Sequence, residues 1–177
     1  MREWLSVYAQ GLASSAANSA ANNAADNAAA MPHLVILYTP NLDRPAAEGG
    51  SDMSALCRAL ADVMLALRDE SGAPAFPPGG TRVLAYPAAH SAVSDGGAAG
   101  RAAGGSGDYA FVYLNLRMAR GRPAAVHQAC GRALEACVMA HFRPLFERGY
   151  IGVTLQIDEG HEVFDAKNSS LHPLFAR

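Results

Sequence analysis

Residues His33-Leu34-Val35-Ile36-Leu37-Tyr38 form a nearly continuous apolar run with the length of a β-strand. Such a run is typical of a strand that is covered on both faces. Ser51 or Asp52 then provides a helix cap, and the residues after it are apolar at the spacing of one helix face. Glycines and prolines between Gly72 and Gly80 end this helix, so a short strand is expected at about 81–86. The apolar helix face consists of Met53, Leu56, Cys57, Leu60, Val63, Met64 and Leu67.

The same order of elements follows a second time. Between Tyr109 and Leu116, aromatic and polar residues alternate with small and aliphatic ones, which predicts a half-buried strand. Pro123 suits the first turn of a long helix and Gly149 suits its end, while Pro144 is expected to kink or shorten it. Alternation over residues 151–157 predicts a fourth strand. The apolar face of this second helix consists of Val126, Cys130, Leu134, Cys137, Val138, Phe142 and Leu145.

Two strand-helix-strand units, over about 32–87 and 108–158, predict an α+β fold. Right-handed connections would place both helices on one face of a four-stranded sheet. The other face then stays uncovered, although the first strand is apolar on both sides, so its burial requires another subunit. The sequence therefore predicts an oligomer. The Gly-rich residues 88–107 are expected to be a mobile surface connection without the features of a phosphate cradle, and residues 159–177 a C-terminal tail.

Residues 1–31 differ in composition from the rest of the chain. They are rich in Ala and Asn and contain too few large apolar residues to fold alone. A secretory signal is not indicated, because Arg2 is followed at once by Glu3 and the apolar stretch after them is interrupted by polar residues. We expect a flexible N-terminal extension with a short helix at its head.

Charge and cysteine content exclude several classes of function. The 14 basic and 16 acidic residues give a net charge of −2, which offers no basic patch for a phosphate backbone. No apolar run is long enough to cross a bilayer. The three cysteines lack the spacing of a structural zinc site and are interpreted as small core residues in a reducing compartment, the cytoplasm.

A search for common catalytic sets returns little. Lys167 is the single lysine, so a Schiff-base mechanism has one candidate amine. His127 and His141 are 14 positions apart on the long helix, too far to chelate one metal ion, and neither His-Glu-x-x-His nor Gly-x-Ser-x-Gly occurs. No metal site is expected.

A series of short motifs resembles the 5-carboxymethyl-2-hydroxymuconate delta-isomerase family of the tautomerase superfamily. The resemblance covers almost all of residues 31–177. Its motifs are Met31-Pro32-His33-Leu34-Val35-Ile36, Gly107-Asp108-Tyr109-Ala110-Phe111-Val112, Gly121-Arg122, His141-Phe142, Lys167-Asn168 and Leu171-His172-Pro173-Leu174-Phe175.

This resemblance implies a tautomerase-like homotrimer that isomerises an unsaturated, polycarboxylated enol acid in aromatic-acid catabolism. It also implies that the initiator Met is removed and that the exposed Pro32 is the catalyst, its secondary amine carrying a proton between two positions of the substrate. A free α-amine has a pKa of about 7.7–8, which burial lowers further, so it can act as a neutral base. No cofactor is required.

Arginines supply the cations that a polycarboxylate needs. Arg122 matches the family's Gly-Arg at the start of the second helix, where the helix N-terminus also favours an anion. Arg82 is the nearest candidate for the family's other substrate arginine, which lies near the start of the second strand. Arg117 and Arg120 are further candidates for binding a substrate carboxylate.

The extension decides whether this chemistry is possible. With residues 1–31 attached, the Pro32 nitrogen is a tertiary amide without a basic lone pair. There are three interpretations: Met31 is the true start, processing exposes Pro32, or the chain is a catalytically silent trimeric homologue that binds small acids or serves assembly. We favour the first.

Overall fold

The computed structural model describes residues 32–160 and 170–175, and the expected extension over 1–31 lies outside them. The chain divides into two units, Met1–Ala30 and Met31–Arg177. The second unit contains, in order, β1 (His33–Tyr38), η1 (Pro40–Asp43), η2 (Ala46–Glu48), α2 (Met53–Ala66), η3 (Pro78–Gly80), β2 (Arg82–Pro87), α3 (Ala98–Ala102), β3 (Tyr109–Met118), α4 (Ala124–Arg148), β4 (Tyr150–Glu159) and η4 (His172–Leu174).

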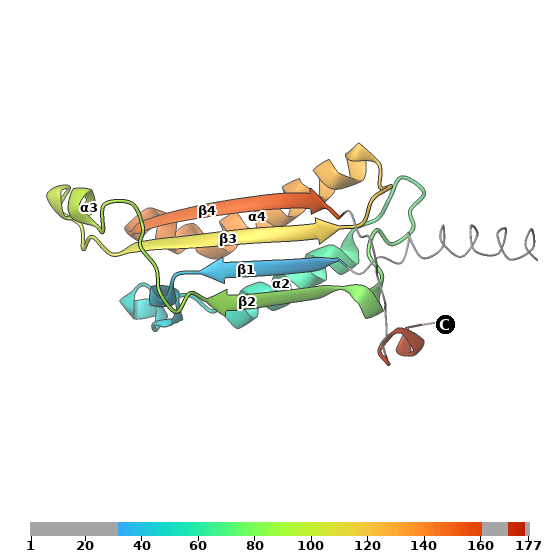
Figure 1. The fold of residues 1–177 in the computed structure, drawn as a ribbon, viewed down its shortest axis with the longest axis horizontal. Coiled ribbons are helices and arrows are strands. Elements are labelled where there is room, and N and C mark those ends of the chain that lie inside the picture. The colour runs from blue at the N-terminus through green and yellow to red at the C-terminus, as the bar shows by residue number, and fades with distance from the viewer. Residues whose placement is uncertain (1–31, 161–169, 176–177) are drawn as a thin grey trace, which may run out of the picture. The chain divides into compact units, whose positions relative to one another are not determined.

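The four strands form one mixed sheet in the order β2-β1-β3-β4. β1 runs parallel to β2, β3 runs parallel to β4, and the two halves join where β1 pairs antiparallel with β3. Both long helices, α2 and α4, lie behind the sheet on the same face (Figure 1). The predicted α+β fold of two β-α-β units is therefore confirmed.

One face of the sheet builds the core. Every second residue of β1 and β3 is buried against the two helices, as the period of a strand requires. The buried set includes Leu34, Ile36, Val112, Leu114 and Leu116 from the sheet and Leu56, Leu60, Met64, Cys130, Leu134, Val138 and Phe142 from the helices.

The opposite face, here called the open face, carries the alternate residues of the same strands. Leu37, Leu84, Tyr86 and Phe111 lie on it, each 38–49% exposed. The apolar run of β1 thus has the residues of a strand buried on both sides, while this chain covers one side only. The prediction of an oligomer from the sequence is based on this uncovered apolar face.

The helix ends follow the sequence signals, with one correction. The Asp52 side chain accepts a hydrogen bond from the Ala55 amide at 2.8 Å and caps α2. Gly149 caps α4, its amide donating to the Leu145 carbonyl at 2.9 Å. Pro144 is expected to kink or shorten this helix, and the shortening is not found, because α4 continues through Pro144 to Arg148. Pro144 lies in the last turns of the helix, where the hydrogen bond it removes is one of few that remain.

The connection over 88–107 contains a short helix and several hydrogen bonds that its glycine content does not indicate. It contains α3, and the Asp95 carboxylate accepts hydrogen bonds from the Gly97 and Ala99 amides. The Gly100 amide donates to the Tyr109 hydroxyl at 2.8 Å, which ties the connection to the start of β3. Gly97 has φ +91°, and a Cβ there would lie 1.9 Å from the Gly107 carbonyl oxygen. The connection lies at the surface as expected, since most of its residues are exposed, and the backbone at Gly97 takes a conformation that favours glycine.

The cysteines are free, as expected from their spacing. Cys130 is fully buried, and burial raises the pKa of its thiol to about 12. Cys57 and Cys137 are half-buried, which corrects the expectation that all three are core residues. Burial raises the pKa of these two thiols as well, so none of the three is poised as a thiolate nucleophile.

The Gly97 geometry gives a stability prediction. Gly97→Ala and Gly104→Ala both place a side chain at positive φ, at +91° and +85°, but the Gly104 site has open space around it. We expect Gly104→Ala to cost about 1–2 kcal/mol of unfolding free energy from the backbone alone, and Gly97→Ala to cost at least about 1 kcal/mol more because the Cβ meets the Gly107 carbonyl. Urea denaturation of the two variants compares them directly. Equal losses would show that the close approach of Gly97 to Gly107 is absent.

Candidate active site

The topology gathers the predicted site residues at one end of the sheet. β1 and β2 begin at the end where β3 and β4 finish, because the two halves join antiparallel (Figure 1). Pro32 precedes β1, Arg82 opens β2 and Arg122 follows β3. We call this end, defined by these three residues, the site end.

Pro32 is buried at the site end. Its carbonyl oxygen accepts a hydrogen bond from the Arg82 amide at 3.4 Å, which extends the β1–β2 ladder by one step. The backbone of Arg82 is therefore fixed against Pro32. The half-buried Arg82 side chain donates from Nη1 to the Gly80 carbonyl at 2.8 Å.

Arg122 lies in the turn between β3 and α4 and is half-buried. Its guanidinium donates to the carbonyls of Ala119 at 3.3 Å and Ala75 at 3.5 Å. The same group stands 5.4 Å from the ring centroid of Phe76, which is fully buried. Burial lowers the pKa of Arg122, yet an arginine stays charged at neutral pH. Arg122 is thus a held cation rather than a solvated turn residue.

A row of polar residues crosses the open face at the site end. The strand register places Arg82 beside His33, His33 beside Arg117, and Arg117 beside Asp158. Hydrogen bonds from Gln156 and Asn115, with the charge of Arg117, hold the pKa of Asp158 below its usual range. Of the further candidate arginines, Arg117 belongs to this row, and Arg120 is exposed in the turn before Arg122.

The two histidines of α4 lie in different surroundings, as their spacing predicted. His141 Nε2 is 2.7 Å from Ser51 Oγ, and burial lowers the pKa of His141 despite the nearby Asp52. His127 lies at the other end of the helix, with its Nε2 3.4 Å from a Glu159 carboxylate oxygen. Within the described part of the chain, this nitrogen is buried without a hydrogen bond.

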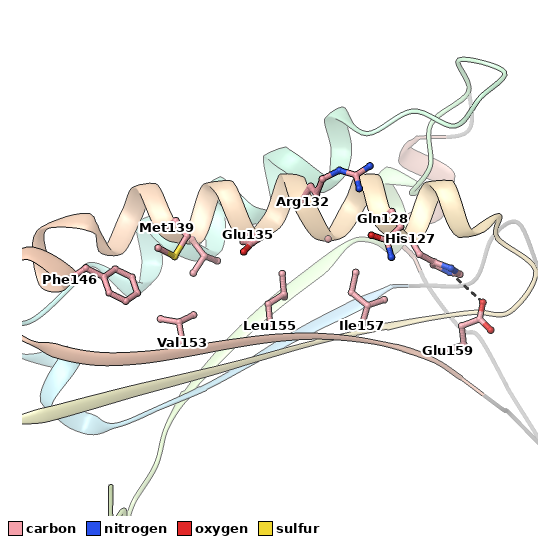
Figure 2. Close-up of a pocket in the computed structure, with 12 residues that line it drawn as sticks. His127, Gln128, Arg132, Glu135, Met139, Phe146, Val153, Leu155, Ile157 and Glu159 are labelled. Atoms are coloured by element: carbon pink, nitrogen blue, oxygen red, sulfur yellow. Dashed lines mark ion pairs between the residues drawn. The ribbon is translucent and has the colours of Figure 1, made fainter. Parts of the chain in front are cut away.

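Sequence reasoning missed the pairing of His127 with Glu159. The two residues are 32 positions apart and meet only because α4 returns antiparallel to β4. They stand at one end of a groove of about 720 Å³ between α4 and β4, the α4–β4 groove (Figure 2). Its floor includes Val153, Leu155 and Ile157. Pro32, Arg82 and Arg122 do not line this groove, so the groove and the predicted site are separate features.

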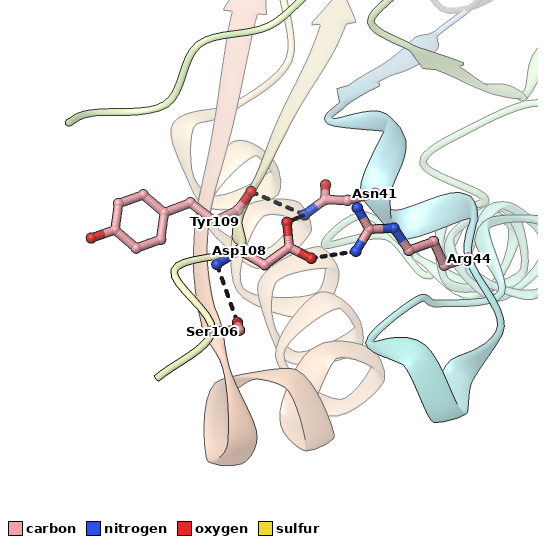
Figure 3. Close-up of polar contacts among 5 residues, drawn as sticks. All are labelled: Asn41, Arg44, Ser106, Asp108 and Tyr109. Atoms are coloured by element: carbon pink, nitrogen blue, oxygen red, sulfur yellow. Dashed lines mark hydrogen bonds and ion pairs between the residues drawn. The ribbon is translucent and has the colours of Figure 1, made fainter. Parts of the chain in front are cut away.

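A polar cluster fixes the opposite end of the sheet. Asp108 accepts hydrogen bonds from Arg44 and Asn41, and Asn41 also donates to the Tyr109 carbonyl at 3.0 Å (Figure 3). The Asp108 amide in turn donates to Ser106 Oγ. These bonds tie the loop after β1 to the start of β3. Their partners are backbone groups and each other, which gives the cluster a structural role.

The described residues contain no group of three or more His, Cys, Asp or Glu side chains arranged to hold a metal ion. Among those same residues, no helix has the length and hydropathy of a membrane span.

Residues 32–175 match the family model of 5-carboxymethyl-2-hydroxymuconate isomerase. The 5-carboxymethyl-2-hydroxymuconate Delta-isomerase of Escherichia coli is 32% identical over 73 residues, which are 41% of this chain and 58% of that protein. The chain thus matches just over half the length of this curated relative.

Two crystal structures resemble the fold. One, of a 5-carboxymethyl-2-hydroxymuconate delta-isomerase, is 55% identical with a TM-score of 0.78, and the match covers 85% of this chain and 96% of the other. The second, a 5-carboxymethyl-2-hydroxymuconate isomerase from Deinococcus radiodurans R1, is 29% identical with a TM-score of 0.66, covering 84% and 96%. These matches confirm the resemblance found in the sequence and its tautomerase-like fold. The chain belongs to the 5-carboxymethyl-2-hydroxymuconate isomerase family.

Proposed function

We propose that this protein is an isomerase that converts 5-carboxymethyl-2-hydroxymuconate to its oxo isomer in aromatic-acid catabolism, with the Pro32 amine as acid and base. One observation carries the proposal. The family match begins at residue 32, and Pro32 is buried at the end of the sheet where Arg82 and Arg122 also lie. A candidate base and two candidate cations therefore share one end of the fold.

The proposed reaction needs no cofactor because it only moves a proton. The Pro32 amine accepts the proton of the 2-hydroxyl group, and the oxygen lone pair becomes the new C=O bond. The conjugated double bonds shift by one position each, and the ammonium returns the proton to the distant carbon. Atoms and electrons balance within the substrate and the amine. Burial favours the neutral amine and so supports its role as a base.

Arg122 and Arg82 would bind the substrate carboxylates and stabilise the dienolate that forms between the two proton transfers. The guanidinium of Arg122 is held by two carbonyls and an aromatic ring, so its position is fixed before substrate arrives. Fixed donors stabilise developing charge without reorganisation. The Arg82 backbone bond to Pro32 supports a position beside the reacting amine.

The open face supports a homotrimer. Leu37, Leu84, Tyr86 and Phe111 form an exposed apolar surface on a sheet that also has two unpaired edges, β2 and β4. A closed ring buries both kinds of surface at once. Three free cysteines fit a reducing compartment, and we place the trimer in the cytoplasm.

The N-terminal segment favours one alternative function. As long as residue 31 is joined to Pro32, the nitrogen is an amide and cannot accept the proton. A chain that keeps this bond would be a catalytically silent homologue that binds small acids or serves assembly.

The two functions are separated by comparing the full chain with one that starts at Met31, whose Met is removable because Pro32 is small. We expect the shorter chain to isomerise 2-hydroxymuconate-type enols, and its rate to fall as pH drops and the amine becomes protonated. The intact chain should be nearly inactive. Absorbance assays over a pH series, with each N-terminus verified by mass, measure both. Equal turnover by the two chains would exclude Pro32 as the base.

The arginine roles are tested by Arg122→Ala. We expect kcat/KM for a polycarboxylate to fall by about 10²-fold or more, as a charge-assisted hydrogen bond is lost, and Arg122→Lys to recover only part of it because the planar donor pair is missing. Arg101→Ala, in the connection at the other end of the sheet, is the control and should leave kcat/KM almost unchanged. An equal fall of kcat/KM in the Arg122 and Arg101 variants would mean that Arg122 contributes only a general positive charge and does not bind the substrate.

A further inference from the structure

The open face is polar at the site end and apolar toward its other end. At the site end, His33 lies between Arg82 and Arg117 in the strand register. Leu37 and Tyr86, near the other ends of β1 and β2, are 48% and 49% exposed. Apolar side chains gain free energy when they are covered, whereas charged side chains lose it unless they find partners. The site end of this face is therefore suited to a polar ligand.

Arg82 and Arg117 flank the start of β1, the strand that Pro32 precedes. β1 lies between β2 and β3 in the sheet (Figure 1), and its first residue, His33, pairs with an arginine on each side. Neighbouring strands are about 4.8 Å apart, so the backbones of the two arginines are about 10 Å apart. Pro32 lies one residue before the position midway between them. The ladder fixes this arrangement, because both arginines belong to paired strands.

Arg122 approaches the same end of the sheet from the side that the helices cover. Its guanidinium lies 5.4 Å from the centroid of an aromatic ring of the hydrophobic core. Arg117, in contrast, is exposed and alternates with the buried Leu116 and Met118, so its side chain belongs to the open face. The start of β1 therefore has arginines on both faces of the sheet.

The polar row at the site end has a surplus of positive charge. It contains two guanidiniums and one carboxylate, that of Asp158, which is next to Arg117 in the register. Asp158 accepts hydrogen bonds from Gln156 at 2.8 Å and from Asn115 at 2.7 Å. A guanidinium has five N–H donors, and one carboxylate takes at most two of them in a bidentate pair. Arg117 beside Asp158 therefore has donors for a second carboxylate.

We propose that Arg117 binds the carboxymethyl carboxylate of the substrate and thereby selects a tricarboxylate over a dicarboxylate. The inference rests on the proposed function for the identity of the substrate, which carries two carboxylates at the ends of the muconate chain and a third on the carboxymethyl branch. Arg122 and Arg82 account for two of the three. Arg117 is a third arginine that the ladder holds beside the start of β1, whereas Arg120 follows the end of β3 and lies outside the ladder.

The test compares two unreactive ligands on the full chain. 2-(Carboxymethyl)hexanedioate has the carbon skeleton and the three carboxylates of the substrate, and hexanedioate lacks only the carboxymethyl branch. Neither has the enol or the double bonds, so binding is measured without turnover. The variant is Arg117→Ala. Its control, Arg143→Ala, removes the same charge from an exposed position of α4. Circular dichroism and urea denaturation verify that both variants are folded.

Isothermal titration calorimetry at constant ionic strength should show that the wild-type chain binds the tricarboxylate about tenfold or more tightly than hexanedioate, as one additional charge-assisted hydrogen bond predicts. Arg117→Ala should lose this preference and keep its affinity for hexanedioate to within about threefold, because a distant exposed charge contributes little. Arg143→Ala should keep both affinities.

Four results would each overturn the proposal: a tricarboxylate preference that survives in Arg117→Ala, an equal loss of affinity for both ligands in that variant, the same change in Arg143→Ala, or a wild-type chain without the preference. Turnover is judged separately. The expected binding pattern in a protein that does not isomerise the substrate would contradict the proposed function and leave the role of Arg117 in carboxylate binding intact.

Discussion

The antiparallel pairing of β1 with β3 is the constraint on which the rest of the structure depends. It joins two β-α-β halves that are each too small to bury their own apolar residues, and it lets both helices cover the same face. It also sets the direction of every strand. The starts of β1 and β2 lie at the same end of the sheet as the ends of β3 and β4. This is why a proline, two arginines and a polar row from distant parts of the sequence lie at the site end.

The same pairing leaves apolar surface and strand edges that this chain alone does not cover. One sheet face and two strand edges stay uncovered, together with the α4–β4 groove and the apolar end of the described chain. The proposed homotrimer would cover the sheet face and the strand edges without any further element. The candidate site and the proposed assembly depend on the same sheet. Its β1–β2 ladder positions Arg82 against Pro32, and its exposed face and edges are the surfaces that the assembly would bury.

Local patterns predicted most of the fold. The alternation over 109–116 and the apolar stripe over 53–67 indicate which side chains lie on the same face of a strand or helix. Such patterns therefore predicted the main strands and helices in the correct order. Pro144 shows where local patterns fail to predict a helix end. The destabilisation that a proline causes in a helix depends on how many helical hydrogen bonds follow it. The contacts within the connection over 88–107, the bond from Gly100 to Tyr109 and the close approach of Gly97 to Gly107, could not be predicted, because composition does not record them.

The residues of the candidate site could be predicted only where a motif of the family contains them. Pro32 and Arg122 came from the resemblance, but nothing local to Arg122 indicates Phe76 or the Ala75 carbonyl, which lie on another loop. His127 and Glu159 likewise meet through tertiary structure alone. The account is tested most directly by a crystal structure of the chain that starts at Pro32, bound to an unreactive polycarboxylate analogue. It predicts carboxylates on Arg122 and Arg82, with the Pro32 nitrogen within about 3 Å of a reacting atom. An analogue bound in the α4–β4 groove, away from Pro32, would contradict it.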